Sequence, residues 1–198
     1  MAIIKSGTGN GFSAHVDEHH HLHTTSLIKK YMAHESQSGG KAFGISTPFL
    51  SVTTTGGRML YVKNTSSNET MFLDRVWFNW DGGSTSHITV AQGIMAFGDT
   101  EPDTNIVAGG AGSLNTSVST SFEMDVLFWD GVGNGMTGHT PGVGAFYFMC
   151  DRGETEYELG GVIVIGPGTT FSFNLKGAEA GIASINILGY MEEYKDHV

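Results

Sequence analysis

The chain has little cysteine and little charge. Cys150 is its only cysteine, so an intrachain disulfide is excluded, and Asp, Glu, Lys and Arg together make up only 15% of its 198 residues. A typical soluble domain has roughly 25% charged residues. A weakly charged surface rich in Ser, Thr and Asn is typical of a protein that meets other protein surfaces, and extracellular durability would explain it equally well.

Long apolar segments are also missing. No run of about 18 apolar residues occurs, so we expect no membrane-spanning segment. Residues 1–7 lack the apolar centre of a secretory signal peptide, and we therefore expect synthesis and folding in a reducing cytoplasm. Cys150 lies in the apolar run of residues 146–150, where we expect it to be a small buried hydrophobe.

The common catalytic motifs are absent as well. The sequence has no Gly-x-Ser-x-Gly elbow, no phosphate-binding Gly-Lys-Ser/Thr loop and no His-Glu-x-x-His motif. Carboxylate pairs such as Asp74 with Asp81, or Glu123 with Asp125, have the residue types that glycoside hydrolysis needs. Acidic residues on exposed strand faces are nevertheless the ordinary case, so we expect no enzymatic activity, no catalytic residue and no cofactor.

Glycine, by contrast, is abundant, with 29 residues in the chain, about twice the usual share of roughly 7%. The clearest pattern lies in the last third. An apolar run (161–165) leads into a Gly-Pro-Gly turn (166–168), an alternating strand (169–175) and a closing strand (182–190). Proline presets φ at the second turn position, and the following glycine accepts a positive φ. This pattern predicts an all-β fold.

The rest of the chain from residue 41 onward has the same character. We expect strands at residues 41–52, 58–64, 71–80, 87–97, 122–129, 143–150, 154–165, 169–175 and 182–191, and a short one near 105–108. About eight or nine such strands predict one antiparallel β-sandwich of jelly-roll type over residues 41–198.

Two details of this body are predicted from local sequence. The Asp-Gly-Gly run at residues 81–83 is a hairpin signal that leads into the strand at 87–97. The preceding strand, 71–80, looks apolar on both faces and central in its sheet. We expect Trp77, Trp80 and Trp129 to lie in the core rather than to form a sugar-stacking platform.

Residues 1–40 differ from the body. They contain six of the nine histidines, few aromatic residues and no strong strand pattern, although residues 26–33 suit a short helix and residues 36–40 a flexible hinge. Their charges balance, whereas residues 41–198 carry the whole formal net charge of −10. An acidic body argues against nucleic-acid binding. We predict that residues 1–40 are an extended N-terminal arm that becomes ordered against a partner.

The histidines of this arm raise the question of a metal site. In an extended chain, His19, His21 and His23 would share one face and could bind Zn²⁺ or Ni²⁺. A solvated arm, or an interface segment whose charge depends on pH, is the interpretation we favour. A cupin-type site is rejected because no Glu follows His21 and His23 at the required distance, and the run precedes the β region.

Two other segments contain residue types that bind calcium. Residues 130–135 half resemble a calcium loop, but Pro141 stands where the bidentate Glu should be. Residues 99–103 could gather oxygen ligands. We interpret the first as a turn and the second as a solvated acidic loop, and we predict no metal site.

Three stretches carry a family resemblance: residues 14–43, with Ala-His-Val-Asp, His-Leu-His and Gly-Gly-Lys-Ala-Phe; residues 58–80, with Arg-Met-Leu-Tyr-Val-Lys-Asn-Thr before the long strand; and residues 165–193, with Ile-Gly-Pro-Gly-Thr-Thr-Phe and Ile-Leu-Gly-Tyr-Met-Glu-Glu. In this order they resemble virion structural proteins of tailed bacteriophages, most of all head decoration (cement) proteins. The resemblance implies a homotrimer on the outer surface of a capsid, bound across neighbouring major capsid protein subunits. It implies no catalytic residues.

The predicted partner contacts are the apolar residues of the arm, which has no core of its own. They are Ile3, Ile4, Phe12, Leu22, Leu27, Ile28 and Tyr31. Three linked arms bind more tightly than one, because each later contact is intramolecular. The alternative function is a receptor- or glycan-binding module of a phage tail, fibre or spike, and a cupin-like metal enzyme is a third.

Overall fold

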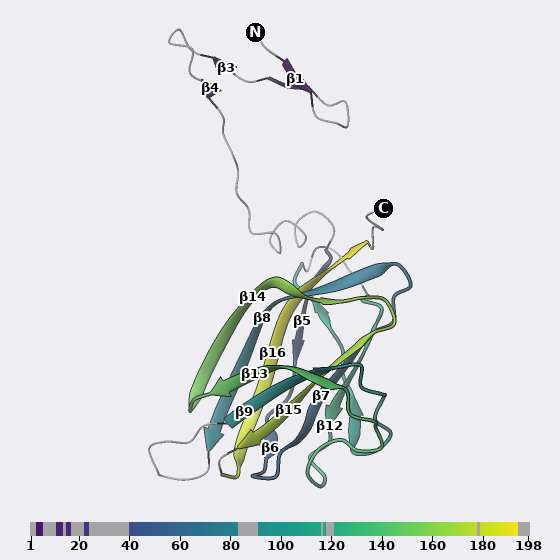
Figure 1. The fold of residues 1–198 in the computed structure, drawn as a ribbon, viewed down its shortest axis with the longest axis vertical. Helices are drawn as coiled ribbons and strands as arrows, with labels where there is room; N and C mark the ends of the chain where they lie inside the picture. The colour runs from purple at the N-terminus through teal and green to yellow at the C-terminus, as the bar shows by residue number, and fades with distance from the viewer. Residues whose placement is uncertain are drawn as a thin grey trace. The chain divides into compact units, whose positions relative to one another are not determined.

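The structure is a computed structural model of the 198-residue chain (Figure 1). It describes residues 40–82, 91–115, 117, 121–177 and 179–193, together with the backbone of four short strands among residues 3–23. Every regular element in these residues is a β-strand, which confirms the all-β prediction. The same residues contain no helix long and apolar enough to cross a membrane.

The chain divides into two compact units, Met1–Lys30 and Tyr31–Val198. In the first, β1 (Ile3–Lys5) pairs with β2 (Gly11–Ser13), and β3 (His15–Val16) pairs with β4 (Leu22–His23), both antiparallel. Strands of two or three residues are too short to leave a strand pattern in the sequence. The helix predicted at residues 26–33 and the hinge at 36–39 lie outside the described residues.

The second unit contains the remaining strands, all of them within residues 41–198, which are called the body here as above: β5 (Ala42–Ser46), β6 (Leu50–Val52), β7 (Gly57–Asn64), β8 (Glu69–Gly82), β9 (Ala91–Phe97), β10 (Ile106–Ala108), β11 (Gly112–Ser113), β12 (Met124–Trp129), β13 (Val143–Cys150), β14 (Gly153–Ile165), β15 (Thr170–Gly177) and β16 (Gly181–Glu193). Each strand predicted from residue 41 onward has a counterpart here. The strand predicted at residues 41–52 is divided into β5 and β6, and the added strand is β11, which is only two residues long.

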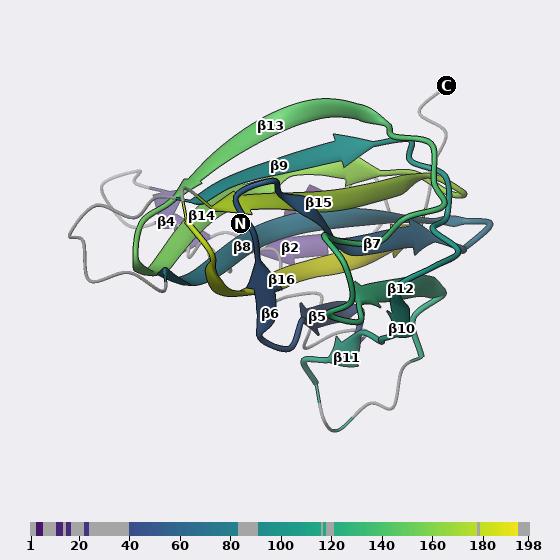
Figure 2. The same ribbon diagram turned by 90° about the horizontal axis from the view of Figure 1, so that it is seen from below.

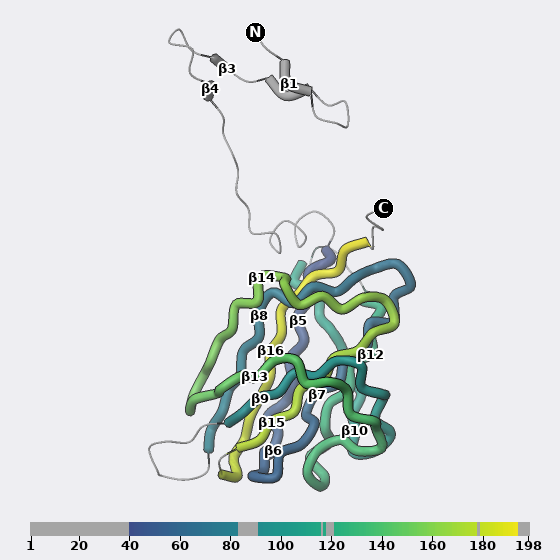
Figure 3. Tube along the Cα trace, in the orientation of Figure 1, coloured from purple at the N-terminus to yellow at the C-terminus, as the bar shows by residue number. Residues whose placement is uncertain are grey.

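These strands form two antiparallel sheets. The first has the order β11-β5-β16-β8-β14, with β6 also paired to β16, and the second has the order β10-β12-β7-β15-β9-β13. Figure 2 shows β13, β9 and β15 in one layer and β8 and β16 in the other. The chain passes from one sheet to the other between β7 and β8 and again between β14 and β15, and Figure 3 draws the trace in the orientation of Figure 1.

Aromatic side chains join the two sheets in one core. Phe78 of the first sheet lies 5.4 Å from Phe148 and 5.6 Å from Phe173 of the second, measured between ring centroids. Burying one such side chain contributes about 1.5–3 kcal/mol. Trp80 and Trp129 are also buried, as predicted, and both belong to this core.

The prediction for Trp77 was wrong, because this residue is only half-buried on the outer face of β8. Side chains alternate between the faces of a strand, so the inward positions Val76 and Phe78 place Trp77 outward. For the same reason β8 is not apolar on both faces. Its central position is confirmed, since it lies between β16 and β14.

The predicted hairpin after residue 80 was also wrong. β8 and β9 belong to different sheets and do not pair. An Asp-Gly-Gly run signals only that the chain can turn, and the neighbours of β8 come from distant parts of the sequence. The Gly166–Gly168 turn is confirmed: Gly168 has a φ of 70° and the Thr169 N–H donates to the Gly166 carbonyl at 3.2 Å.

Candidate interaction surface

The most unusual surface of the body lies on β13, the terminal strand of the second sheet. Four large apolar residues of this one strand are exposed: Val143 (77%), Tyr147 (66%), Met149 (56%) and Phe146 (41%). We call them the β13 patch. Tyr147 and Met149 lie on the outer face of the strand, whereas Phe146 lies opposite the buried Met95 on the inner side and its ring contacts Phe97. The patch therefore spans both faces of the sheet edge, and large exposed apolar side chains on one strand mark a candidate interaction site.

Contacts with neighbouring strands hold β13 in place beneath the β13 patch. Phe148 and Cys150 of the same strand point inward and are buried. On the outer face, Tyr147 lies opposite Ile94 of β9. The Tyr157 hydroxyl of β14 accepts a hydrogen bond from the Met149 N–H at 2.9 Å and donates to the Met149 carbonyl at 2.5 Å. The strand is therefore held in place from both sides, so a partner would meet a preformed surface.

A second apolar area lies on the outer face of the first sheet. Tyr190, Phe72 and Val164 are neighbours in one cross-strand row, and the Phe72 and Tyr190 rings stack with centroids 5.0 Å apart. Val164 is 53% exposed, and Val162 on the same strand is 76% exposed. We call this the Val164 row. It continues to Ala42, the first residue of β5, which pairs with Tyr190.

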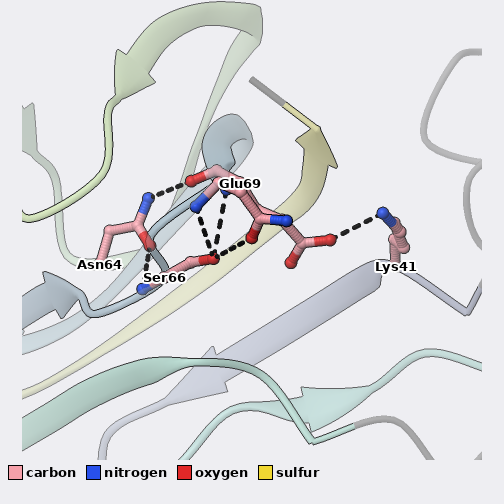
Figure 4. A network of polar contacts seen from close by, with 5 residues as sticks. Lys41, Asn64, Ser66 and Glu69 are labelled. Carbon is pink, nitrogen blue, oxygen red and sulfur yellow. Dashed lines mark hydrogen bonds and ion pairs between the residues drawn. The ribbon is translucent and has the colours of Figure 1, made fainter. Parts of the chain in front are cut away.

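The start of the body is fastened by a polar network at the turn between β7 and β8 (Figure 4). Asn64 Nδ2 donates to the carbonyl oxygens of Glu69 at 2.8 Å and Ile165 at 3.1 Å. Ser66 Oγ accepts from the Glu69 N–H at 3.2 Å, and Lys41 Nζ lies 2.7 Å from Glu69 Oε1. Residue 41, where residues 1–40 join the body, is thus tied to the beginning of β8.

The most deeply buried ion pair of the described residues lies on the outer face of the second sheet. Arg58 Nη2 lies 2.9 Å from Asp99 Oδ1, and the two side chains are 2% and 0% exposed. The Asp99 carboxylate also accepts hydrogen bonds from the Gly142 N–H and the Ser172 hydroxyl. The Thr170 hydroxyl donates to the Asp99 carbonyl at 2.9 Å. We call these five residues the Arg58–Asp99 cluster.

This cluster holds two loops against the sheet. Asp99 belongs to the loop that follows β9, and Gly142 ends the loop that follows β12. The second loop approaches β7 so closely that a Cβ on Gly57 would clash with the Asn134 carbonyl. Interpreting residues 99–103 as a fully solvated loop was therefore wrong for Asp99, because its partner Arg58 is distant in sequence. The cluster has a structural role, since both carboxylate oxygens of Asp99 already accept hydrogen bonds within the protein.

Burial shifts the titration of the groups beside the cluster. Burial and then nearby acidic residues raise the pKa of Tyr61 to about 12. Burial and then the Arg58 guanidinium lower the pKa of His139, against weaker opposing effects of Asp99 and Thr137. Tyr61 stays protonated and His139 stays neutral near pH 7. Among the described residues, no group of three or more His, Cys, Asp or Glu side chains could hold a metal ion.

The predicted arm contacts are described only in part. Ile3 and Ile4 lie in β1, Phe12 in β2 and Leu22 in β4. Ile4 lies opposite Phe12 in the β1–β2 register. Leu27, Ile28 and Tyr31, together with His19 and His21, lie outside the described residues. His23 lies opposite His15 in the β3–β4 register.

Cys150 is 1% exposed, as predicted. Burial and then the neighbouring Asp151 raise the pKa of its thiol to about 12. Because the thiolate is the reactive form, we expect Ellman's reagent near pH 8 to label native protein roughly a hundredfold or more slowly than unfolded protein. The absorbance of the thiolate that the reagent releases measures the labelling rate of native and of unfolded protein. Equal rates would contradict the burial of Cys150.

Sequence reasoning missed both the β13 patch and the Arg58–Asp99 cluster. Residues 143–150 were correctly predicted as a strand, but their apolar character gave no sign that the strand ends a sheet. Comparison of the chain with protein-family models, curated proteins and solved structures finds no match.

Proposed function

We propose that this protein is a noncatalytic virion structural protein that decorates and stabilises a bacteriophage capsid as a homotrimer bound across neighbouring major capsid protein subunits. The observation that carries the proposal is the β13 patch, where a terminal strand exposes four large apolar side chains. A protein partner removes such a surface from water. We propose the outer capsid surface as its location, after synthesis in the host cytoplasm.

We further propose that the body is a jelly-roll sandwich. Without the short strands β6, β10 and β11, and without β12, the strands in chain order are β5, β7, β8, β9, β13, β14, β15 and β16. The first of them pairs with the last (β5 with β16), the second with the seventh, the third with the sixth and the fourth with the fifth. This nested pairing, divided between two sheets, supports a jelly roll, an architecture common in viral capsid and lectin domains.

In a three-fold symmetric ring, a neighbouring copy of the chain covers the β13 patch. In a closed ring, each copy's patch meets a different surface of its neighbour, so three copies cover all three patches. A ring of three also presents three copies of residues 1–40 to the shell. We propose these residues as the docking arm, with the Val164 row beside Ala42 as further apolar surface at the end of the body where the arm joins.

The charge of the body favours protein partners over nucleic acid. Residues 41–198 carry the formal net charge of −10, and a phosphate backbone is bound by clustered Lys and Arg. Several acidic residues of the body also neutralise its own arginines. Arg75 forms ion pairs with Glu156 and Glu158, each at 2.8 Å.

The proposal is tested by the mass of the full-length chain in solution. We expect analytical ultracentrifugation to give about 63 kDa, three times the 21.1 kDa of one chain. Replacing Tyr147→Lys together with Met149→Lys places two charges in the β13 patch and should yield monomers, because a buried unpaired charge costs several kcal/mol.

The matched control carries two lysines at exposed apolar positions outside the patch. Val107→Lys with Val132→Lys alters side chains that are 51% and 60% exposed, and this variant should remain trimeric. A monomeric native chain, or a trimer unaffected by the Tyr147 and Met149 changes, would contradict the proposed role of the patch.

A further inference from the structure

A hollow of about 450 Å³ opens at the end of the first sheet, between the end of β8 and the start of β14. It is lined by Phe49, Asn79, Trp80, Asp81, Arg152, Gly153 and Glu154. Its volume falls in the range of roughly 300–1,000 Å³ typical of small-molecule sites. None of these residues belongs to the β13 patch or to the Arg58–Asp99 cluster.

The exposed aromatic residue that lines the hollow is Phe49, and its backbone is anchored. Phe49 is 70% exposed, and it lies in the short connection between β5 and β6. Thr47, two residues earlier, is buried and fixed twice to β16: its N–H donates to the Ile185 carbonyl and its hydroxyl accepts from the Ile185 N–H, both at 2.9 Å. Pro48 restricts the backbone further. The backbone that carries the exposed ring is therefore anchored to β16 before any ligand arrives.

Polar groups complete the hollow. Arg152 reaches Asp81 Oδ1 through Nε at 2.9 Å and through Nη2 at 2.8 Å. Within the described part of the chain these contacts use one carboxylate oxygen of Asp81, and the other can accept from a ligand. Asn79 and Glu154 also line the hollow. Asn79 is steadied by a 3.2 Å hydrogen bond from its Nδ2 to Ser184 Oγ. The side chains supply both donors and acceptors beside an apolar ring.

We infer that this hollow binds a neutral saccharide, with the apolar face of a pyranose ring stacked on Phe49 and its hydroxyl groups bonded to Asp81, Arg152 and Asn79. A pyranose has one C–H face and a rim of hydroxyls that both donate and accept, which matches an aromatic ring surrounded by carboxylate, guanidinium and amide groups. The two carboxylates outnumber the one guanidinium. An acidic sugar is therefore disfavoured.

The position of the hollow fits a ligand outside the particle. The hollow lies at the Asn79–Asp81 end of β8, whereas residue 41 contacts Glu69 at the opposite end. β8 has 14 residues, so at roughly 3.3 Å per residue the two ends are about 40 Å apart. The point where residues 1–40 join the body therefore lies away from the hollow. The inference itself does not depend on docking through those residues.

The test uses the full-length chain, labelled with a fluorophore, on a printed array of neutral and acidic oligosaccharides. We expect binding to a subset of neutral oligosaccharides, with a dissociation constant in the millimolar range or tighter in a titration followed by NMR. Phe49→Ala should weaken this binding at least tenfold, and Phe49→Trp should preserve it, because the indole offers the same stacking surface.

Val132→Ala is the matched control, since it truncates another exposed apolar side chain (60%) in a loop outside the hollow. Its binding should equal that of the native chain. If the three variants have equal melting temperatures, any loss of oligosaccharide binding results from the change in the hollow and not from unfolding. An array without neutral hits, a preference for acidic oligosaccharides, or undiminished binding by Phe49→Ala would each overturn the inference, and none of these results bears on trimer formation.

Discussion

Replacing Asp99→Ala is expected to lower the free energy of unfolding by about 3–5 kcal/mol, because it leaves the buried Arg58 guanidinium without its counter-charge. The change also removes the acceptor for the Gly142 N–H and the Ser172 hydroxyl. For a chain of this length, the melting temperature should fall by about 6–20 °C. Chemical denaturation and calorimetry measure the two quantities.

An exposed ion pair supplies the control for this effect. Glu156 is 42% exposed and pairs with Arg75 at 2.8 Å. Exposed pairs of this kind contribute about 0–1 kcal/mol, so Glu156→Ala should change the free energy of unfolding by no more than that. If Asp99→Ala and Glu156→Ala had equally small effects, the Arg58–Asp99 cluster would not hold the two loops on the sheet.

Deleting residues 1–40 is expected to abolish binding to capsids while leaving the body folded. The buried core of the residues that the structure describes lies within residues 42–191, so the melting temperature of the body should change little. Loss of three linked contacts should weaken binding to undecorated shells by about 10²–10⁴-fold. Co-sedimentation of the truncated and full-length chains with such shells measures this change.

A double substitution tests whether the arm binds the shell through its apolar side chains. Ile4 and Phe12 occupy opposite positions in the β1–β2 pair, and Ile4→Asp with Phe12→Asp should weaken shell binding in the same direction as the deletion. Val107→Asp alters an exposed side chain of the body and should leave binding unchanged. Native-like binding by the truncated chain would show that another surface docks on the shell.

Most strand positions of the body could be predicted from the sequence, because residue types close together in the chain determine them. Residues 143–150 and the turn at Gly166–Gly168 were predicted at their observed positions. Apolar runs bounded by Gly, Pro and Asn leave few other conformations. Which strands pair was not accessible for β8 and β9, because pairing depends on contacts between residues far apart in the chain.

The candidate sites were less accessible, for the same physical reason. Asp99 is buried only because Arg58, on another strand, supplies its charge partner. Tyr147 and Met149 are exposed because they point to the outer face of β13, and a run that is apolar at every position does not indicate which face is buried. Phe49 follows a proline in a short connection, and no local pattern indicates that its ring stands beside the end of β8.

Electron cryomicroscopy of the intact particle tests the proposed function most directly. We expect density for this chain on the outer surface of the head, three copies around each occupied three-fold or quasi-three-fold axis, with residues 1–40 lying on major capsid protein subunits. A chain found only in the tail, inside the shell or as isolated single copies would contradict the proposal.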